Sequence, residues 1–116
     1  MLAAKAARVA AWILALAIVV LSIVPPGLRP ETNMPHHLEH FAIFFATGVA
    51  FMSGYGQRAL GVAIALVAFA GLIEIAQLYV PGRHARLSDF IVDAAALCVG
   101  MALALLAGAR KLQQIA

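Results

Sequence analysis

The sequence predicts an all-α polytopic membrane protein, a single domain over residues 1–116 with four antiparallel transmembrane helices. Hydrophobic residues make up 65% of the chain and charged residues 11%, whereas a soluble domain is roughly 45–50% apolar and about 25% charged. Four apolar stretches each approach the ~20 residues that cross the hydrocarbon core of a bilayer. None alternates apolar and polar residues as the strands of a membrane β-barrel do. Lipid is therefore expected to be the solvent for most of this surface.

The first two helices are bounded by prolines. A helix is predicted over 7–24, where Pro25 and Pro26 follow and cannot continue it. No small-residue cleavage site occurs there, so we interpret this stretch as an uncleaved helix rather than a signal peptide. The second helix is predicted over 36–54, directly after Pro35, because the first turn tolerates a missing N–H.

The other two helices are separated by a short loop. The third is predicted over 59–80, before Pro81, and the fourth over 88–108, with Ser88 or Asp89 as its N-cap. Short connections make consecutive helices antiparallel. The fourth helix also carries small residues at intervals of four, a pattern that lets membrane helices pack closely. They are Ala96, Gly100, Ala104 and Gly108.

The positive charges predict an orientation. Five Lys and Arg fall on one side of the membrane (Lys5, Arg8, Arg58, Arg110, Lys111) and three on the other (Arg29, Arg83, Arg86). Because cytoplasmic loops carry the excess of positive charge, both termini are expected in the cytoplasm of a bacterial inner membrane. The formal net charge of +3 comes from these flanking residues. With no basic stripe interleaved with aromatics, membrane lipid is the expected partner and nucleic acid is not.

Polar residues gather at the opposite, extracytoplasmic side. Ionisable groups inside membrane helices are costly and are functional candidates for that reason. The sequence predicts a pocket there, with Arg83 bridging two buried carboxylates because its guanidinium fork is always charged. In particular, Glu74, Arg83 and Asp93 are expected to form one coupled unit. The predicted binding residues are Glu74, Gln77, Arg83, Asp89 and Asp93, and the catalytic candidates are His40, Glu74 and Asp93.

The polar residues allow two other interpretations. The cluster could instead staple the outer ends of three helices without binding anything. The run from His36 to His40 contains H-x-x-E-H, which supplies zinc ligands in some metalloproteases. Because the match is short and lies in a first helical turn, no metal and no cofactor are expected. Cys98 has no partner for a disulfide or a zinc site and is expected to be a small apolar packing residue.

At these positions the chain resembles the VanZ-like family of small bacterial membrane proteins, from Met34 to about Leu106. Two residues, His36 and His37, depart from the family's usual Asp-Lys pair. The matching elements are His40-Phe41, Glu74-Ile75-Ala76-Gln77, Pro81-Gly82-Arg83, Asp89, Asp93 and Gly100. The resemblance implies a helical inner-membrane protein whose founding relative is associated with low-level resistance to the glycopeptide teicoplanin. It implies no particular reaction.

The leading functional hypothesis is a cell-envelope role, in which the pocket recognises a polar, cationic or lipid-linked group at the outer leaflet. One alternative is an intramembrane hydrolase or transferase acting on a lipid headgroup. In that case His40 would be the general acid or base, oriented by Glu74 or Asp93. Another alternative is a small oligomeric carrier, although a carrier needs polar groups along a whole path and the inner halves of these helices are apolar.

Overall fold

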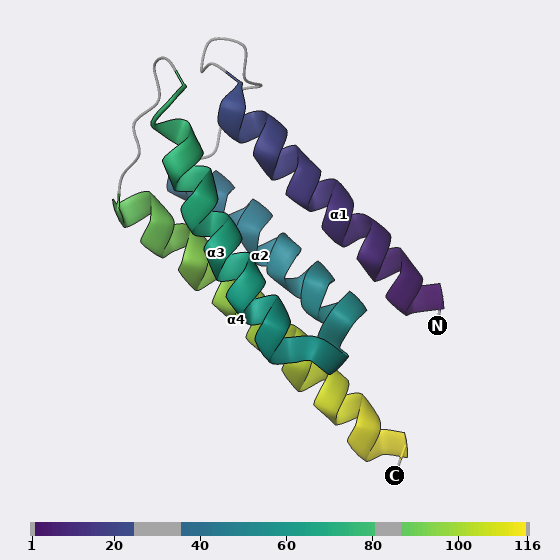
Figure 1. Ribbon diagram of the computed structural model, residues 1–116. Coiled ribbons are helices and arrows are strands. Elements are labelled where there is room, and N and C mark those ends of the chain that lie inside the picture. Colours follow the sequence, from purple (N-terminus) through teal and green to yellow (C-terminus); the bar gives the residue numbers. More distant parts are fainter. Residues whose placement is uncertain (1, 25–35, 81–86, 116) are drawn as a thin grey trace.

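The computed structural model describes residues 2–24, 36–80 and 87–115, without the side chains of 36–37 and 111–115. These residues form four α-helices and a short 3₁₀ helix, and no strand occurs among them (Figure 1). The elements are α1 (Leu2–Ile23), α2 (His36–Tyr55), η2 (Gly56–Arg58), α3 (Ala59–Gln77) and α4 (Leu87–Ile115). The predicted all-α class is confirmed for the described part of the chain.

Successive helices run in opposite directions along a common axis (Figure 1). The molecule is elongated, with dimensions of 53 × 24 × 22 Å. Helix α2 packs on α1 and most extensively on α4, whereas α3 packs mainly on α4. The starts of α2 and α4 and the end of α3 therefore lie at one end of the bundle, and both chain termini lie at the other (Figure 1).

Three continuous helical stretches are long and apolar enough to cross a membrane, which supports a membrane protein by length and composition. They are Leu2–Ile23, Leu38–Gln77 and Leu87–Arg110. The middle stretch has 40 residues and contains α2, η2 and α3. The chain reverses direction at η2, so α2 and α3 form a helical hairpin (Figure 1).

Several helix ends differ from the sequence prediction. α1 begins at Leu2 rather than at residue 7, because its alanine-rich start favours helix beyond the apolar run. α3 ends at Gln77 rather than at residue 80, and the next three amide groups donate to carbonyls three residues earlier. These tighter bonds mark the end of an α-helix.

The fourth helix also differs at both ends. α4 begins at Leu87, so Ser88 and Asp89 lie in its first turn and neither is the N-cap. It continues to Ile115, past the predicted end at Gly108, because one glycine costs a helix only about 1 kcal/mol and does not end it. Cys98, expected to be a packing residue, is exposed on this helix.

The centre of the bundle is the crossing of α2 and α4. Ala96 and Gly100 of the small-residue stripe are buried there, as the spacing predicted. A Cβ atom on Gly100 would collide with the carbonyl oxygen of Phe45, so only glycine allows this approach. Gly108 has nothing within 4 Å of its Cβ position and takes no part in the contact.

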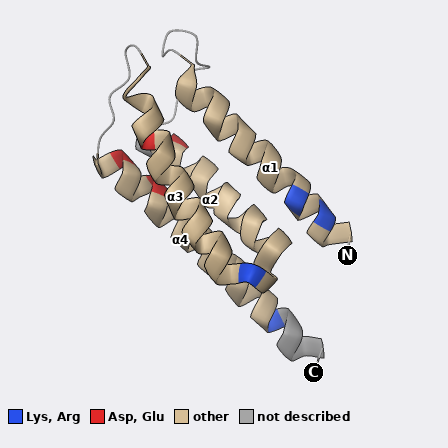
Figure 2. Ribbon diagram, viewed as in Figure 1, with Lys and Arg blue, Asp and Glu red and all other residues tan. Residues whose placement is uncertain are grey.

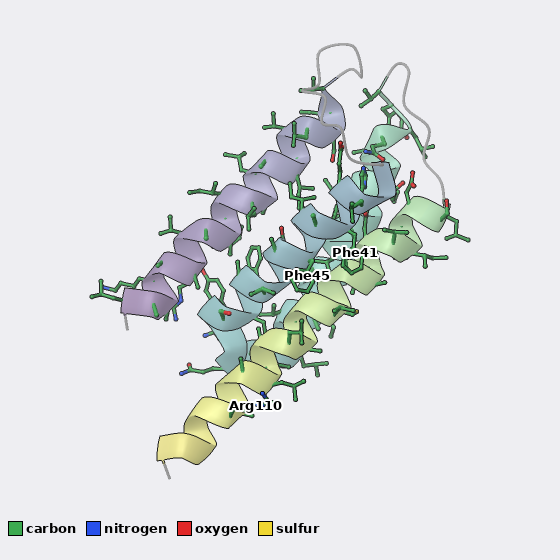
Figure 3. All side chains as sticks on the ribbon, turned by 180° about the vertical axis from the view of Figure 1, so that it is seen from behind. Phe41, Phe45 and Arg110 are labelled. Carbon is green, nitrogen blue, oxygen red and sulfur yellow. The ribbon has the colours of Figure 1, made fainter. Side chains whose placement is uncertain are left out.

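Phe41 and Phe45 stack one turn apart on α2, with ring centroids 6.1 Å apart (Figure 3). Arg110 lies towards the far end of α4 (Figure 3).

Candidate functional site

The described charges separate completely between the two ends of the bundle (Figure 2). The acidic residues lie where α2 and α4 begin and α3 ends, and we call this the acidic end. They are Glu39, Glu74, Asp89 and Asp93. The described Lys and Arg lie at the opposite, basic end, and are Lys5, Arg8, Arg58 and Arg110. The gathering of polar side chains expected from the sequence is therefore present in the described part of the fold.

The central contact at the acidic end joins α2 to α4. Nδ1 of His40 lies 3.0 Å from Oδ1 of Asp93. When the Asp93 carboxyl is ionised, Nδ1–H is the donor and the carboxylate accepts. The His40 ring also stacks on Phe44, one turn further along α2, with ring centroids 6.2 Å apart. His40 is thus held from two sides, by an apolar ring and by a carboxylate.

Asp93 is the most enclosed polar residue of the site, with 0% of its surface exposed. It lies six residues into α4, so it is about 9 Å from the helix start at about 1.5 Å per residue. Its second carboxylate oxygen, Oδ2, is buried and accepts no hydrogen bond within the described residues. A buried acceptor left without a donor costs about 1–3 kcal/mol, and more when charged. Within the described residues, one half of this carboxyl is therefore satisfied and the other half is not.

Three further predicted residues are buried at this end: Glu74 and Gln77 on α3 and Asp89 on α4. Glu74 and Gln77 are three residues apart and share one face of the helix. Glu74 lies three residues from the end of α3, about 4.5 Å. The predicted helix end at residue 80 would have put Glu74 about 9 Å from that end, but this end was wrong because α3 ends at Gln77. Both carboxylate oxygens of Glu74 are enclosed.

Not every predicted contact falls within the described residues. Arg83, expected to bridge Glu74 and Asp93, lies outside them, so the proposed three-residue unit stays a prediction. The side chain of His36 also lies outside them, and with it the H-x-x-E-H pairing. Among the described residues, no three His, Cys, Asp or Glu side chains come close enough together to hold a metal ion.

A second polar contact, at the basic end, was not anticipated from the sequence. Arg8 donates from Nε to the carbonyl oxygen of Gly54 at 2.8 Å. Trp12 donates from Nε1 to the hydroxyl of Tyr55 at 2.9 Å. The i, i+4 spacing of Arg8 and Trp12 was a signal for a shared helix face, but nothing in the sequence pointed to Gly54 and Tyr55 as its partners.

The acidic end can do two things chemically. A histidine bonded to a buried carboxylate is oriented for proton transfer. A buried acceptor with an unused lone pair can receive a hydrogen bond from a ligand. Comparison with known proteins adds no assignment, since no match was found among protein-family models, curated proteins or solved structures.

Proposed function

We propose that this chain is a bacterial inner-membrane protein with four spans, whose acidic end faces away from the cytoplasm and binds a ligand of the cell envelope. The span count rests on α2 and α3, which have 20 and 19 residues. Each is about 30 Å long at about 1.5 Å per residue, the thickness of a hydrocarbon core. Leu38–Gln77 then crosses twice, because its 40 residues would otherwise be about twice the length required.

The orientation follows from charge. Lys5, Arg8, Arg58 and Arg110 lie at the basic end, and the positive-inside rule assigns such an end to the cytoplasm. Both termini are then cytoplasmic, and the acidic end meets the outer leaflet.

The binding proposal rests on one observation, the half-satisfied carboxyl of Asp93. A fold that needed only to join α2 to α4 could use apolar residues there, since buried pairs are often replaced by apolar residues with no loss of stability. A buried carboxylate with one oxygen that no described residue bonds instead offers an acceptor to a polar or cationic group. Glu74, Gln77 and Asp89 are buried at the same end and would surround such a group, together with the predicted Arg83.

The family proposal rests on the motif residues alone. Of the elements that resemble the VanZ-like family, His40, Glu74, Gln77, Asp89 and Asp93 are the buried polar residues of the acidic end. A role in the envelope, including a response to glycopeptides, is the function that this resemblance suggests for the site.

A second candidate, favoured by the His40–Asp93 hydrogen bond, is an intramembrane hydrolase or transferase that acts on a lipid headgroup. His40 would move a proton and Asp93 would hold its ring in one orientation.

The test replaces one acceptor atom. Asp93→Asn keeps an oxygen that can accept from His40 but puts an NH₂ donor where Oδ2 was. A strain lacking the gene would be complemented with wild type, Asp93→Asn, Glu74→Gln and the control Glu39→Gln, and its sensitivity to teicoplanin and other envelope stresses measured. We expect Asp93→Asn and Glu74→Gln to be produced at wild-type levels but to lose complementation, with Glu39→Gln active.

If every variant that folds also complements fully, the acidic end only staples the helices and the binding proposal fails. Headgroup analysis of membrane lipids in the same strains separates the second candidate. Accumulation of an unprocessed lipid in the Asp93→Asn strain would indicate an enzyme, and unchanged lipid composition would indicate a binding role.

A further inference from the structure

A shallow, open groove of about 400 Å³ lies on the exposed surface of α1 at the basic end. Its lining side chains are Arg8, Val9, Trp12, Ile13 and Leu16. Arg8 is the only charged residue among them, and the floor towards Leu16 is apolar. From Arg8 to Leu16 the groove extends over eight helical steps, about 12 Å, from the end of the bundle towards its middle.

The mouth of the groove is fixed in place by α2. The Arg8 guanidinium is bonded through Nε to the Gly54 carbonyl and lies over the Tyr55 ring, 5.0 Å from its centroid. Gly54 makes room for this contact, because a Cβ there would lie 2.8 Å from Cγ of Arg8. A guanidinium has five N–H donors, so bonding through Nε leaves its two terminal NH₂ groups as further donors. Arg8 is therefore held in one orientation and keeps N–H donors for a ligand.

The surroundings favour an anion with an apolar tail. Lys5 and Arg58 lie at the same end, and every acidic residue that the structure describes lies at the other (Figure 2). Arginine binds phosphate oxygens through parallel N–H donors. A soluble anion would gain nothing from the apolar floor, whereas an acyl chain would cover it.

We propose that this groove binds an anionic phospholipid, with the phosphate at Arg8 and one acyl chain along Val9, Ile13 and Leu16. The site is independent of the acidic end and of any function assigned there. It links the α1–α2 contact to the lipid composition of one leaflet, because the residue that meets the phosphate also forms a hydrogen bond between the two helices.

The test is lipid competition. The protein would be reconstituted in nanodiscs with equal amounts of phosphatidylglycerol and phosphatidylcholine carrying the same acyl chains, and retained lipid counted by native mass spectrometry. We expect wild type to retain phosphatidylglycerol about fivefold in preference, the factor expected for one arginine beside an anionic lipid. Arg8→Gln should lose that preference. Arg58→Gln, which removes the same charge from the same end but lies outside the groove, should keep it.

A second variant, Ile13→Trp, keeps Arg8 and its contacts but occupies the groove with a larger side chain. Because Ile13 is exposed, this variant should fold. It therefore tests the proposed acyl-chain contact even if Arg8→Gln does not fold. We expect it to retain less phosphatidylglycerol. Three results would overturn the proposal. They are an equal loss of the phosphatidylglycerol preference in Arg8→Gln and Arg58→Gln, no such preference in wild type, and full retention of phosphatidylglycerol by Ile13→Trp. Displacement of the lipid by excess glycerol phosphate would overturn it too, by showing a site for a soluble anion.

Discussion

Gly48 of α2 lies against the backbone of Leu97 in α4, so closely that a Cβ atom on Gly48 would be 2.6 Å from the Leu97 carbonyl oxygen. Gly100 makes the reciprocal approach to Phe45 from the other helix. Inside a bilayer there is no hydrophobic driving force between helices, so close packing through small residues stabilises such a crossing. The same crossing sets the position of His40 relative to Asp93, one to two turns away.

Gly100→Ala is expected to destabilise the protein. Alanine improves helix propensity by about 1 kcal/mol, but its Cβ would meet a backbone carbonyl that no rotamer change can move aside. Overpacking of this kind costs about 1–3 kcal/mol, so the net effect should be a loss. Thermal unfolding in detergent measures it.

Gly108→Ala is the matched control on the same helix and in the same stripe. Nothing lies within 4 Å of its Cβ position, so the propensity gain of at most about 1 kcal/mol should remain. A Gly100→Ala variant as stable as Gly108→Ala would contradict the α2–α4 crossing described above.

The helices were predicted from the sequence more accurately than the residues at which they begin and end. Apolar runs of the right length gave the helices, and the reversal at Gly56–Arg58 was expected. The ends were less accurate because hydropathy marks what lipid covers and not where a helix stops. α1 starts at Leu2, in residues that are outside the apolar run but favour helix. α3 stops at Gln77 although apolar residues continue beyond it.

The gathering of these polar residues at one end of the bundle was predicted from the sequence, but their pairing was not. The sequence brought His40, Glu74 and Asp93 to one end, and left open which carboxylate orients the histidine. Asp93 is the one within 3.0 Å, and that depends on the register of α2 against α4. The register is set by Gly48 as much as by Gly100, and only Gly100 stood out, because it belongs to a repeat of small residues.

Tyr55→Phe tests the contact at the basic end. The change removes the hydroxyl that accepts from Trp12 Nε1 and keeps the ring that stacks on Phe51, with centroids 6.1 Å apart. Interhelical hydrogen bonds in membranes average about 0.6 kcal/mol, so only a small loss of stability is expected. Trp12 is the only tryptophan, and its emission should shift to shorter wavelength because the indole loses a polar partner.

Tyr79→Phe is the control for that change, since Tyr79 is exposed at the other end of the bundle. Its emission spectrum should match that of wild type. An unchanged spectrum in Tyr55→Phe would show that the indole and the phenol do not interact in the membrane.

The proposed topology predicts opposite labelling of two exposed positions. In a Cys98→Ala background, Ser88→Cys lies at the acidic end and Gln57→Cys in η2. An impermeant maleimide should label Ser88→Cys in intact spheroplasts and Gln57→Cys only after lysis. The reverse labelling pattern would show that the protein has the opposite orientation in the membrane. Failure to label position 57 under either condition would place η2 inside the bilayer and count against two crossings by Leu38–Gln77.

The His40–Asp93 pair should show strong coupling in a double-mutant cycle. His40→Ala removes the partner of a fully buried carboxyl, and breaking a buried pair from one side costs about 3–5 kcal/mol. The double variant with Asp93→Ala leaves no charge behind, so it should lose less than the sum of the two single losses. The cycle is measured by unfolding in detergent under conditions where each variant remains folded at the start.

The size of the coupling decides between two descriptions of the acidic end. An interaction well above the ~0.5 kcal/mol within which independent sites add would mean that His40 is what makes the buried Asp93 tolerable. Additive losses would mean that Asp93 is stabilised by another group, and the 3.0 Å contact would then carry little energy. Asp93→Asn separates charge from shape in the same assay, because the amide oxygen can still accept from Nδ1 while the buried charge is gone. If the coupling is large, the interaction of His40 with the amide in Asp93→Asn should be weaker than its interaction with Asp93 in wild type. Asp93→Asn should nevertheless be more stable than His40→Ala, because His40→Ala keeps the buried charge and removes its partner.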